Sequence, residues 1–345
     1  MPVSPSKVYL HIGPPKTGTT YLQDILDKNR RRLGSSGVAF PKRPIDHFRA
    51  ALDLRGMRFG GFEDPRTEGA WARLADAVAH CRRPAAIVSH EILAGASERQ
   101  AARAVQSLAP AAVHVVYAAR DLGRLLPAVW QESLKNRRVR PYEAFVEQTL
   151  RQYGSDLERP HFWRSQDPVR TLQRWGTAVP SAHIHVLVVP PSRQPPDLLW
   201  VRFCQVLGIS PEGFRLRVAR VNRSLGFSEA EVLRRANAEI PEEVPWPRFE
   251  RVVKDFFNRR AAHGSSTDDA IVVPDQHRAA VMAIADEIRA ALADSPYDVV
   301  GDLAELVPAP SAFGPMPQPQ SPMVAEAARN MRRLRHRLKR GFRPL

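Results

Sequence analysis

The sequence has little cysteine and no long apolar run, and both shortages limit what the protein can be. Only Cys81 and Cys204 are present, far apart and without a pattern of metal ligands around them. We therefore expect two small buried side chains rather than a disulfide or a zinc site. No apolar stretch approaches the roughly 20 residues of a membrane-spanning helix, and residues 1–7 lack a signal peptide's apolar core. We expect a cytoplasmic protein.

Acidic residues are also in short supply. The chain has 51 Lys and Arg against 36 Asp and Glu, which gives a formal net charge of +15 over 345 residues. From Met323 onward there are eight basic residues and one acid, Glu326, so the excess is concentrated at the C-terminal end. A basic protein suits an anionic substrate, but it also suits nucleic acid or an anionic membrane. Charge alone therefore leaves the class of partner open.

The most informative stretch lies near the N-terminus, where an apolar strand over residues 8–12 leads through a short loop into a helix. Leu22, Ile25 and Leu26 recur at helical spacing after the loop. A strand that runs through a glycine-containing turn into a helix presents backbone N–H groups to a phosphate, and the helix dipole adds positive potential there. The sequence therefore predicts an anion site at this turn.

The loop lacks the lysine that directly follows the second glycine of a Walker A motif. Gly13 and Gly18 have the Walker spacing, but Thr19 stands where that lysine would be, and the lysine occurs inside the loop as Lys16. The usual cation for a β/γ-phosphate tail is thus absent, whereas one cation and two hydroxyls remain for a single terminal group. The alternative is an ordinary strand–turn–helix with an incidental lysine.

The run Pro-Lys-Thr-Gly-Thr-Thr at positions 15–20 resembles the 5′-phosphosulfate-binding loop of sulfotransferases that use 3′-phosphoadenosine 5′-phosphosulfate (PAPS). The resemblance covers about residues 7–306 and implies an α/β fold, a three-layer α/β/α arrangement with a central parallel sheet, related to P-loop proteins. It implies that Lys16 stabilises charge on the leaving bisphosphate, PAP, and that Tyr21 stacks on the adenine. It assigns donor binding to Pro15, Lys16, Thr17, Gly18, Thr19, Thr20 and Tyr21.

Two polar residues, His90 and Glu91, follow the next predicted buried strand, residues 85–89. Ligands of open α/β sheets bind at the carboxyl ends of strands. Sulfotransferases place the catalytic base after the corresponding strand: the sequence up to His90 resembles the cytosolic enzymes, and Ser-x-Glu resembles bacterial relatives. At neutral pH a carboxyl with a pKa of about 4.3 is deprotonated, whereas histidine has a pKa of about 6.5. Both residues remain candidates, and either can instead cap the next helix.

A third strand, residues 112–119, is followed by Arg120 and a helix. This resembles the sulfotransferase 3′-phosphate motif, in which an arginine follows the strand, since a guanidinium binds phosphate oxygens bidentately. The family's serine eight residues later is replaced by Ala128, and we expect Arg124, one helical turn after Arg120, to take its place. A surface ion pair is the alternative role for Arg120. After the strand at residues 183–189, two prolines replace the family's adenine-contact motif.

The C-terminal part is divided by composition into a domain over residues 1–307, a linker and a tail. Six of the fifteen residues 308–322 are proline, which predicts an extended, semi-rigid linker. Residues 323–345 predict a basic amphipathic helix, the C-terminal extension of the fold. Such a helix suits an anionic membrane surface, with peripheral attachment at the inner face, or a partner's groove; the alternatives are that it folds back onto the domain or is disordered.

The sequence thus predicts a metal-independent sulfotransferase that transfers a sulfuryl group from PAPS to a hydroxyl or amine. The acceptor remains open among a glycan, a glycolipid and a small metabolite. Two rivals are kept: a nucleotide-dependent kinase with a variant phosphate loop, and a non-catalytic protein that binds nucleic acid or membrane through its charge. No nucleic-acid motif occurs, and we expect no nucleic-acid partner.

Overall fold

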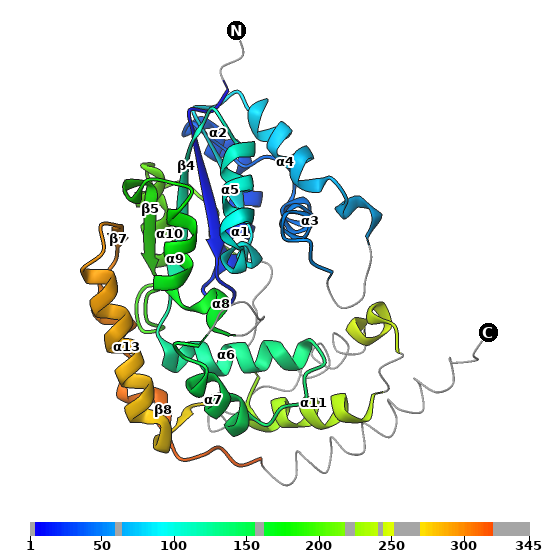
Figure 1. Cartoon of the computed structure of the whole chain (residues 1–345), viewed down its shortest axis with the longest axis vertical. Coiled ribbons are helices and arrows are strands. Elements are labelled where there is room, and N and C mark those ends of the chain that lie inside the picture. The colour runs from blue at the N-terminus through cyan, green and yellow to red at the C-terminus, as the bar shows by residue number, and fades with distance from the viewer. Residues whose placement is uncertain are drawn as a thin grey trace, which may run out of the picture.

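Six parallel strands form the central sheet, in the order β2-β3-β1-β4-β5-β7 (Figure 1). The computed structural model describes residues 4–58, 64–155, 162–217, 225–240, 244–251 and 270–319. β1 is flanked by β3 and β4, so the direction in which strands are added reverses at β1, where ligands of such sheets bind. The strands are β1 (Lys7–Gly13), β2 (Val38–Ala39), β3 (Ala85–Ser89), β4 (Ala112–Ala119), β5 (Ile184–Val188) and β7 (Asp298–Val300).

Both faces of the sheet are buried, as a parallel sheet requires. In β1, Val8, Leu10 and Ile12 pack into one hydrophobic cluster, whereas Tyr9 packs into the other on the opposite face. Because successive strand residues point to opposite faces, one apolar strand supplies both cores. This is why the central strands read as continuous apolar runs.

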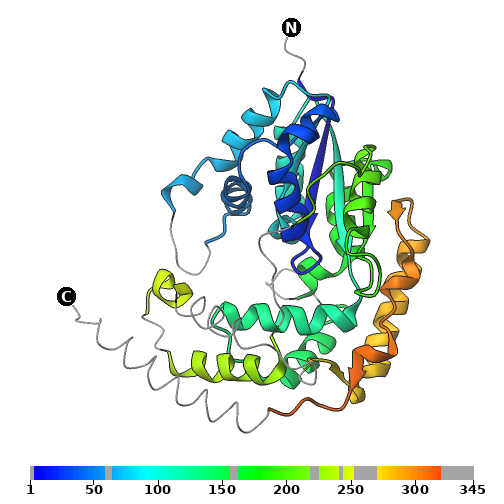
Figure 2. The ribbon, with the colours of Figure 1, turned by 180° about the vertical axis from the view of Figure 1, so that it is seen from behind.

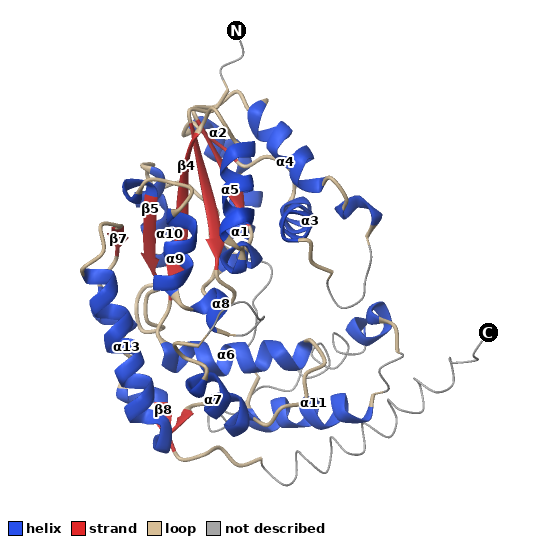
Figure 3. Ribbon diagram, in the orientation of Figure 1, coloured by secondary structure: helices blue, strands red, loops and turns tan. Residues whose placement is uncertain are grey.

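Helices cover the two faces and extend beyond the strand ends. One face packs on α1, α2 and α10, and the other on α3, α4, α5 and α9; Figure 1 looks onto α5 and α9, and Figure 2 onto α1. Helices α6, α7 and α11 form a further layer beyond the carboxyl ends of the strands (Figure 3). The helices are α1 (Thr19–Lys28), α2 (Arg30–Ser35), α3 (Pro44–Arg55), α4 (Ala70–Ala79), α5 (Glu98–Ser107), α6 (Leu122–Lys135), α7 (Tyr142–Arg151), α8 (Trp163–Gln166), α9 (Pro168–Gly176), α10 (Leu198–Leu207), α11 (Phe227–Glu239) and α13 (Arg278–Ala293).

The predicted fold class, a three-layer α/β/α arrangement around a parallel sheet, is confirmed. The first four predicted core elements lie where the apolar patterns put them: β1, α1, β3 and β4. Within the described residues, no helix combines the length and apolar character needed to cross a membrane.

The start of the predicted linker is packed rather than extended. β8 (Phe313–Gly314) pairs with β6 (Val273–Pro274), and Phe313 is buried. A Cβ built on Gly123 would lie 2.6 Å from Ala312 Cβ and 3.0 Å from Pro308 Cβ, so the segment rests directly on the first turn of α6. The missing side chain of Gly123 allows this approach, a tertiary effect that proline content does not reveal. The predicted helix at 323–345 lies outside the described residues, and the division at residue 307 stays a prediction.

Two buried histidines lie beside the end of β3. His11 Nδ1 is 2.8 Å from Ser89 Oγ, and His47 Nδ1 accepts a hydrogen bond from the Ser89 backbone N–H at 3.3 Å. Burial, reinforced by the nearby His90, lowers the pKa of His11 to about 3 and that of His47 to about 4. Both side chains are therefore neutral in the folded protein across the physiological range.

These depressed pKa values predict a loss of stability in mild acid. Because the unfolded histidines titrate near pH 6.5, the unfolded chain binds more protons below that pH, and stability falls as the pH drops toward the folded values. The loss is on the order of 2 kcal/mol per histidine at pH 5. His47→Gln should make the free energy of urea unfolding less dependent on pH between 5 and 7.5. An unchanged slope in this variant would contradict the assignment.

Candidate active site

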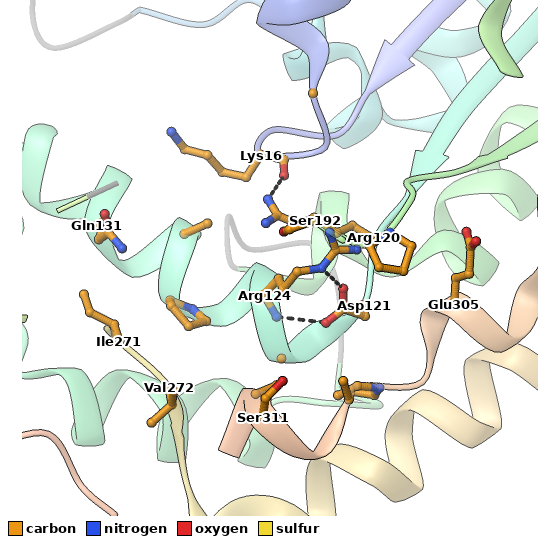
Figure 4. A pocket seen from close by; sticks show the side chains of 18 of the residues that line it. Lys16, Arg120, Asp121, Arg124, Gln131, Ser192, Ile271, Val272, Glu305 and Ser311 are labelled. Atoms are coloured by element: carbon orange, nitrogen blue, oxygen red, sulfur yellow. Dashed lines mark hydrogen bonds and ion pairs between the residues drawn. The ribbon is translucent and has the colours of Figure 1, made fainter. Parts of the chain in front are cut away.

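A pocket of about 1310 Å³ lies where β1, β3 and β4 end, above α6 (Figure 4). One face of α6 forms its floor, because residues 124, 128, 131 and 135 follow one another at helical spacing. The rest of the wall comes from Glu91, from Arg120 and Asp121 before α6, from Leu225, and from four longer segments of the described chain. These are positions 15–21, positions 191–194, positions 270–272 and positions 302–312.

The loop between β1 and α1 has the backbone shape of an anion site. Lys16 and Gly18 both have left-handed backbone conformations, with φ of 71° and 88°. Gly18 is the N-cap residue of α1, so no capping side chain covers the N–H groups of the first turn, and that turn contains no acidic residue. Those N–H groups and the positive end of the helix dipole remain available to an anion.

The hydroxyl of Thr17 is used inside the loop. Its Oγ1 donates to the Pro14 carbonyl at 2.6 Å, and the side chain is fully buried. Thr19 is also almost fully buried but lines the pocket together with Thr20, whereas Thr17 is not among the lining residues. Thr17 therefore shapes the loop, a use of the hydroxyl that the sequence did not indicate.

Lys16 reaches across the pocket to α6. Its Nζ lies 2.5 Å from Glu132 Oε2, and Lys135 Nζ lies 3.5 Å from the same oxygen. Burial would raise the pKa of Glu132, but the two lysines outweigh that effect and lower it, so the carboxylate is ionised. Figure 4 shows Lys16 extending from the loop above the helix that carries Gln131. The one cation of the loop is thus held by a carboxylate on α6.

Arg120 joins the loop to the end of β4. Its Nη1 donates to the Lys16 carbonyl at 2.6 Å (Figure 4). Burial, followed by the nearby Arg124, lowers the pKa of Arg120 to about 10, which leaves it charged at neutral pH. Arg120 also lines the pocket. The two predicted donor-binding features, the Lys16 loop and Arg120, are therefore in direct contact at the pocket.

Most of the Arg124 guanidinium is used in hydrogen bonds within the protein. Its Nε pairs with Asp121, and its Nη1 and Nη2 donate to the carbonyls of Pro190 and Val189 at 2.8 and 3.2 Å. Three of the five N–H groups of the guanidinium are used in this way. Asp121 also caps α6 by accepting from the Arg124 backbone N–H at 2.9 Å. Arg124 lines the pocket, but its main contacts tie α6 to the chain after β5.

The two candidate bases differ in their surroundings. His90 is buried, its Nδ1 accepts from the Ile92 backbone N–H at 3.3 Å, and it is not among the pocket-lining residues. Glu91 lines the pocket, and its Oε2 is buried without a hydrogen-bond partner among the described residues. Burial lowers the pKa of His90 against the opposing charge of Glu91. The capping role considered for either residue therefore falls to His90.

Most of the predicted site residues come together in this pocket. Tyr21 lines it from α1, half-buried, and burial raises the pKa of its hydroxyl. Glu132 and Lys135 were not predicted; the helical spacing from Arg124 along α6 was the available signal. The predicted residues that line the pocket are Pro15, Lys16, Gly18, Thr19, Thr20, Tyr21, Glu91, Arg120 and Arg124.

Comparisons with known proteins add one distant likeness. No family model matches the chain, and no curated protein matches it. Among solved structures, it is similar to the crystal structure of a sulfotransferase from Alicyclobacillus acidocaldarius, with a TM-score of 0.42 and 14% sequence identity, over 73% of this chain and 96% of that chain. A likeness this distant assigns no function, which has to be inferred from the residues of the site. In the part of the chain that the structure describes, no cluster of three or more His, Cys, Asp or Glu could hold a metal ion.

The close approach of Gly13 to Glu91 predicts a specific sensitivity to substitution. Gly13 has φ of 93°, and a Cβ there would lie 2.5 Å from the Glu91 Cα. Gly13→Ala should lower the free energy of urea unfolding by more than Gly56→Ala does. Gly56 is the matched control because it is also left-handed, with φ of 59°, but has nothing within 4 Å of its Cβ position. The strain common to both is about 1 kcal/mol or more. If both variants lost the same free energy of unfolding, the close approach of Gly13 to Glu91 would be contradicted.

Proposed function

We propose that the protein transfers a sulfuryl group from PAPS to a hydroxyl or amine acceptor. The observation that carries the proposal is the contact of Arg120 with the Lys16 loop, beside the uncapped first turn of α1. A 5′-phosphosulfate placed at the loop would have its charge met by backbone N–H groups and by Lys16. Arg120 would receive the second phosphate of the same nucleotide.

The reaction needs no group beyond those in the pocket. The acceptor oxygen or nitrogen attacks sulfur, the bond from sulfur to the oxygen of the 5′-phosphate breaks, and the acceptor proton passes to a base. Lys16 Nζ stabilises the charge that develops on the oxygen that leaves with the bisphosphate. As in phosphoryl transfer, such catalysis depends on positioning and electrostatic stabilisation. Lys16 must exchange Glu132 for the donor before it can act.

Glu91 is the better candidate for the base. Because His90 is neutral and its Nδ1 accepts a hydrogen bond, its other nitrogen carries the proton, and no lone pair is left to take another. Glu91 lines the pocket, and its buried Oε2 lacks a hydrogen-bond partner among the described residues. We therefore assign proton abstraction to Glu91 and helix capping to His90.

The rival functions receive less support from the contacts. A Walker-type kinase would need a lysine directly after Gly18, where the sequence has Thr19, and the carboxylate at the end of β4, Asp121, caps α6 and pairs with Arg124. A protein that binds nucleic acid or membrane through its charge gains nothing from the pairing of Lys16 and Lys135 with Glu132. Contact of residues 323–345 with an anionic membrane and a cytoplasmic location stay predictions.

The pocket leaves room for an acceptor beside the donor. Pockets for one small ligand usually measure about 300–1,000 Å³, and this one measures about 1310 Å³. Its wall mixes five acidic with five basic side chains, so charge does not select among a glycan, a glycolipid and a small metabolite. The proposal therefore includes all three acceptor classes.

Turnover of PAPS with paired variants tests the proposal and the choice of base. Glu91→Gln should lower the rate of PAP formation about 100-fold, because general-base catalysis contributes at least that much, and should leave PAP affinity nearly unchanged. His90→Asn keeps a side-chain cap and should retain most of the activity. If His90→Asn lost activity and Glu91→Gln kept it, the assignment would be reversed. Absence of PAPS turnover by the wild type across a hydroxyl and amine panel would refute the function.

A further inference from the structure

The chain directly after Glu91 is held by arginines from three different helices. Residues Glu91–Gly95 form a short 3-10 helix, and positions 93–96 are buried. Buried backbone carbonyls need hydrogen-bond donors, and a short helix leaves its last carbonyls without partners of its own. Arg55 ends α3, Arg164 lies in α8 and Arg174 lies in α9. Their helices converge on this segment from distant parts of the sequence.

Guanidinium groups supply the donors for four of the five carbonyls from residue 92 to residue 96. Arg55 Nη1 donates to the Ile92 carbonyl at 2.8 Å, and Arg164 Nε donates to the Gly95 carbonyl at 2.9 Å. Arg174 takes the other two. Its Nη2 donates to Ala94 and its Nε to Ala96, both at 3.1 Å. The fifth carbonyl, of Leu93, accepts from the Ala96 backbone N–H at 2.9 Å.

The arrangement is tight and electrostatically costly. A Cβ on Gly95 would lie 2.9 Å from Arg55 Nη1, so the guanidinium rests against the main chain. Burial, and then repulsion from Arg164 and Arg174, lowers the pKa of Arg55 to about 10. Three like charges are gathered where neutral donors could have bonded the same carbonyls. Fixed guanidinium forks, however, define the direction of each carbonyl more rigidly than flexible neutral side chains do.

We propose that Arg55, Arg164 and Arg174 are positioning residues that fix the backbone after Glu91 and so aim its carboxylate into the pocket. The other side of Glu91 is fixed by Gly13, whose Cβ position is 2.5 Å from the Glu91 Cα. The His90 backbone N–H, bonded to the His11 carbonyl at 3.0 Å, continues the pairing of β1 and β3 up to this point. The arginine clamp completes the restraint on the C-terminal side, where no strand continues. This inference rests on the proposed role of Glu91.

The test combines a structural readout with a kinetic one on the full chain. Arg174→Ala removes two of the four carbonyl contacts and should increase hydrogen–deuterium exchange of amides 92–97. It should lower the turnover of PAPS about 10- to 100-fold, the scale expected for a misplaced catalytic group, while PAP affinity measured by calorimetry stays within about twofold. Free guanidinium ion at millimolar concentration should restore part of the activity. Arg174→Lys keeps the charge but not the guanidinium fork, and its turnover of PAPS should lie between those of the wild type and Arg174→Ala.

Arg103→Ala, an exposed arginine on α5, is the matched control and should change neither readout. Wild-type turnover by Arg174→Ala would overturn the proposal, and increased exchange with unchanged turnover would show that the clamp serves stability alone. If Arg174→Ala does not fold, Arg55→Lys tests the Ile92 contact in the same two measurements. A wild type that neither binds PAP nor consumes PAPS would refute the proposed function instead, while the exchange measurement would still report on the clamp.

Discussion

The hydrogen bond from Arg120 to the Lys16 carbonyl is the contact on which the site depends. It joins the end of β4 to the loop after β1 at 2.6 Å, and so brings together residues that are 104 positions apart. A loop with two left-handed residues has little internal regularity to keep its shape. Arg120 on one side and the main chain of Glu91 on the other give it that shape. The open first turn of α1 then faces the pocket in a fixed direction.

Charge pairing is the second constraint on the site. Lys16 is bound to Glu132, Arg124 to Asp121, and Arg202 to Glu305, which lines the pocket. An anionic donor bound by Lys16, as proposed, would replace the first of these carboxylates. Lys16 and Glu132 keep 19% and 38% of their side-chain surface exposed, so water screens part of their attraction and lowers the cost of separating them. Lys135 remains to neutralise Glu132 after Lys16 has moved to the donor.

Local patterns allowed much of the fold to be predicted, and contacts between distant segments explain what was missed. Apolar spacing and two glycines were enough to predict the strand, loop and helix around Lys16. Apolar runs alone were enough to predict β3 and β4. The pairing of Lys16 with Glu132 joins residues 116 positions apart, so no local pattern contains it. The hydrogen bonds from Arg124 to the carbonyls of Pro190 and Val189 likewise join distant segments, because they depend on where β5 lies. The presence of a glycine at position 123 did not by itself predict that residues 308–312 pack against it.

The central claim is that the Lys16 loop binds the nucleotide of a sulfuryl donor and that Glu132 competes for its lysine. The most direct measurement is calorimetric titration of PAP, without metal, into the wild type, Lys16→Ala and Glu132→Gln, with ATP and Mg²⁺ in parallel. The account predicts metal-free binding of PAP that is weakened by Lys16→Ala and strengthened about two- to fivefold by Glu132→Gln, in line with a partly exposed ion pair. The account would be contradicted if ATP with Mg²⁺ bound in preference to PAP, or if the affinity for PAP were the same in the wild type and both variants.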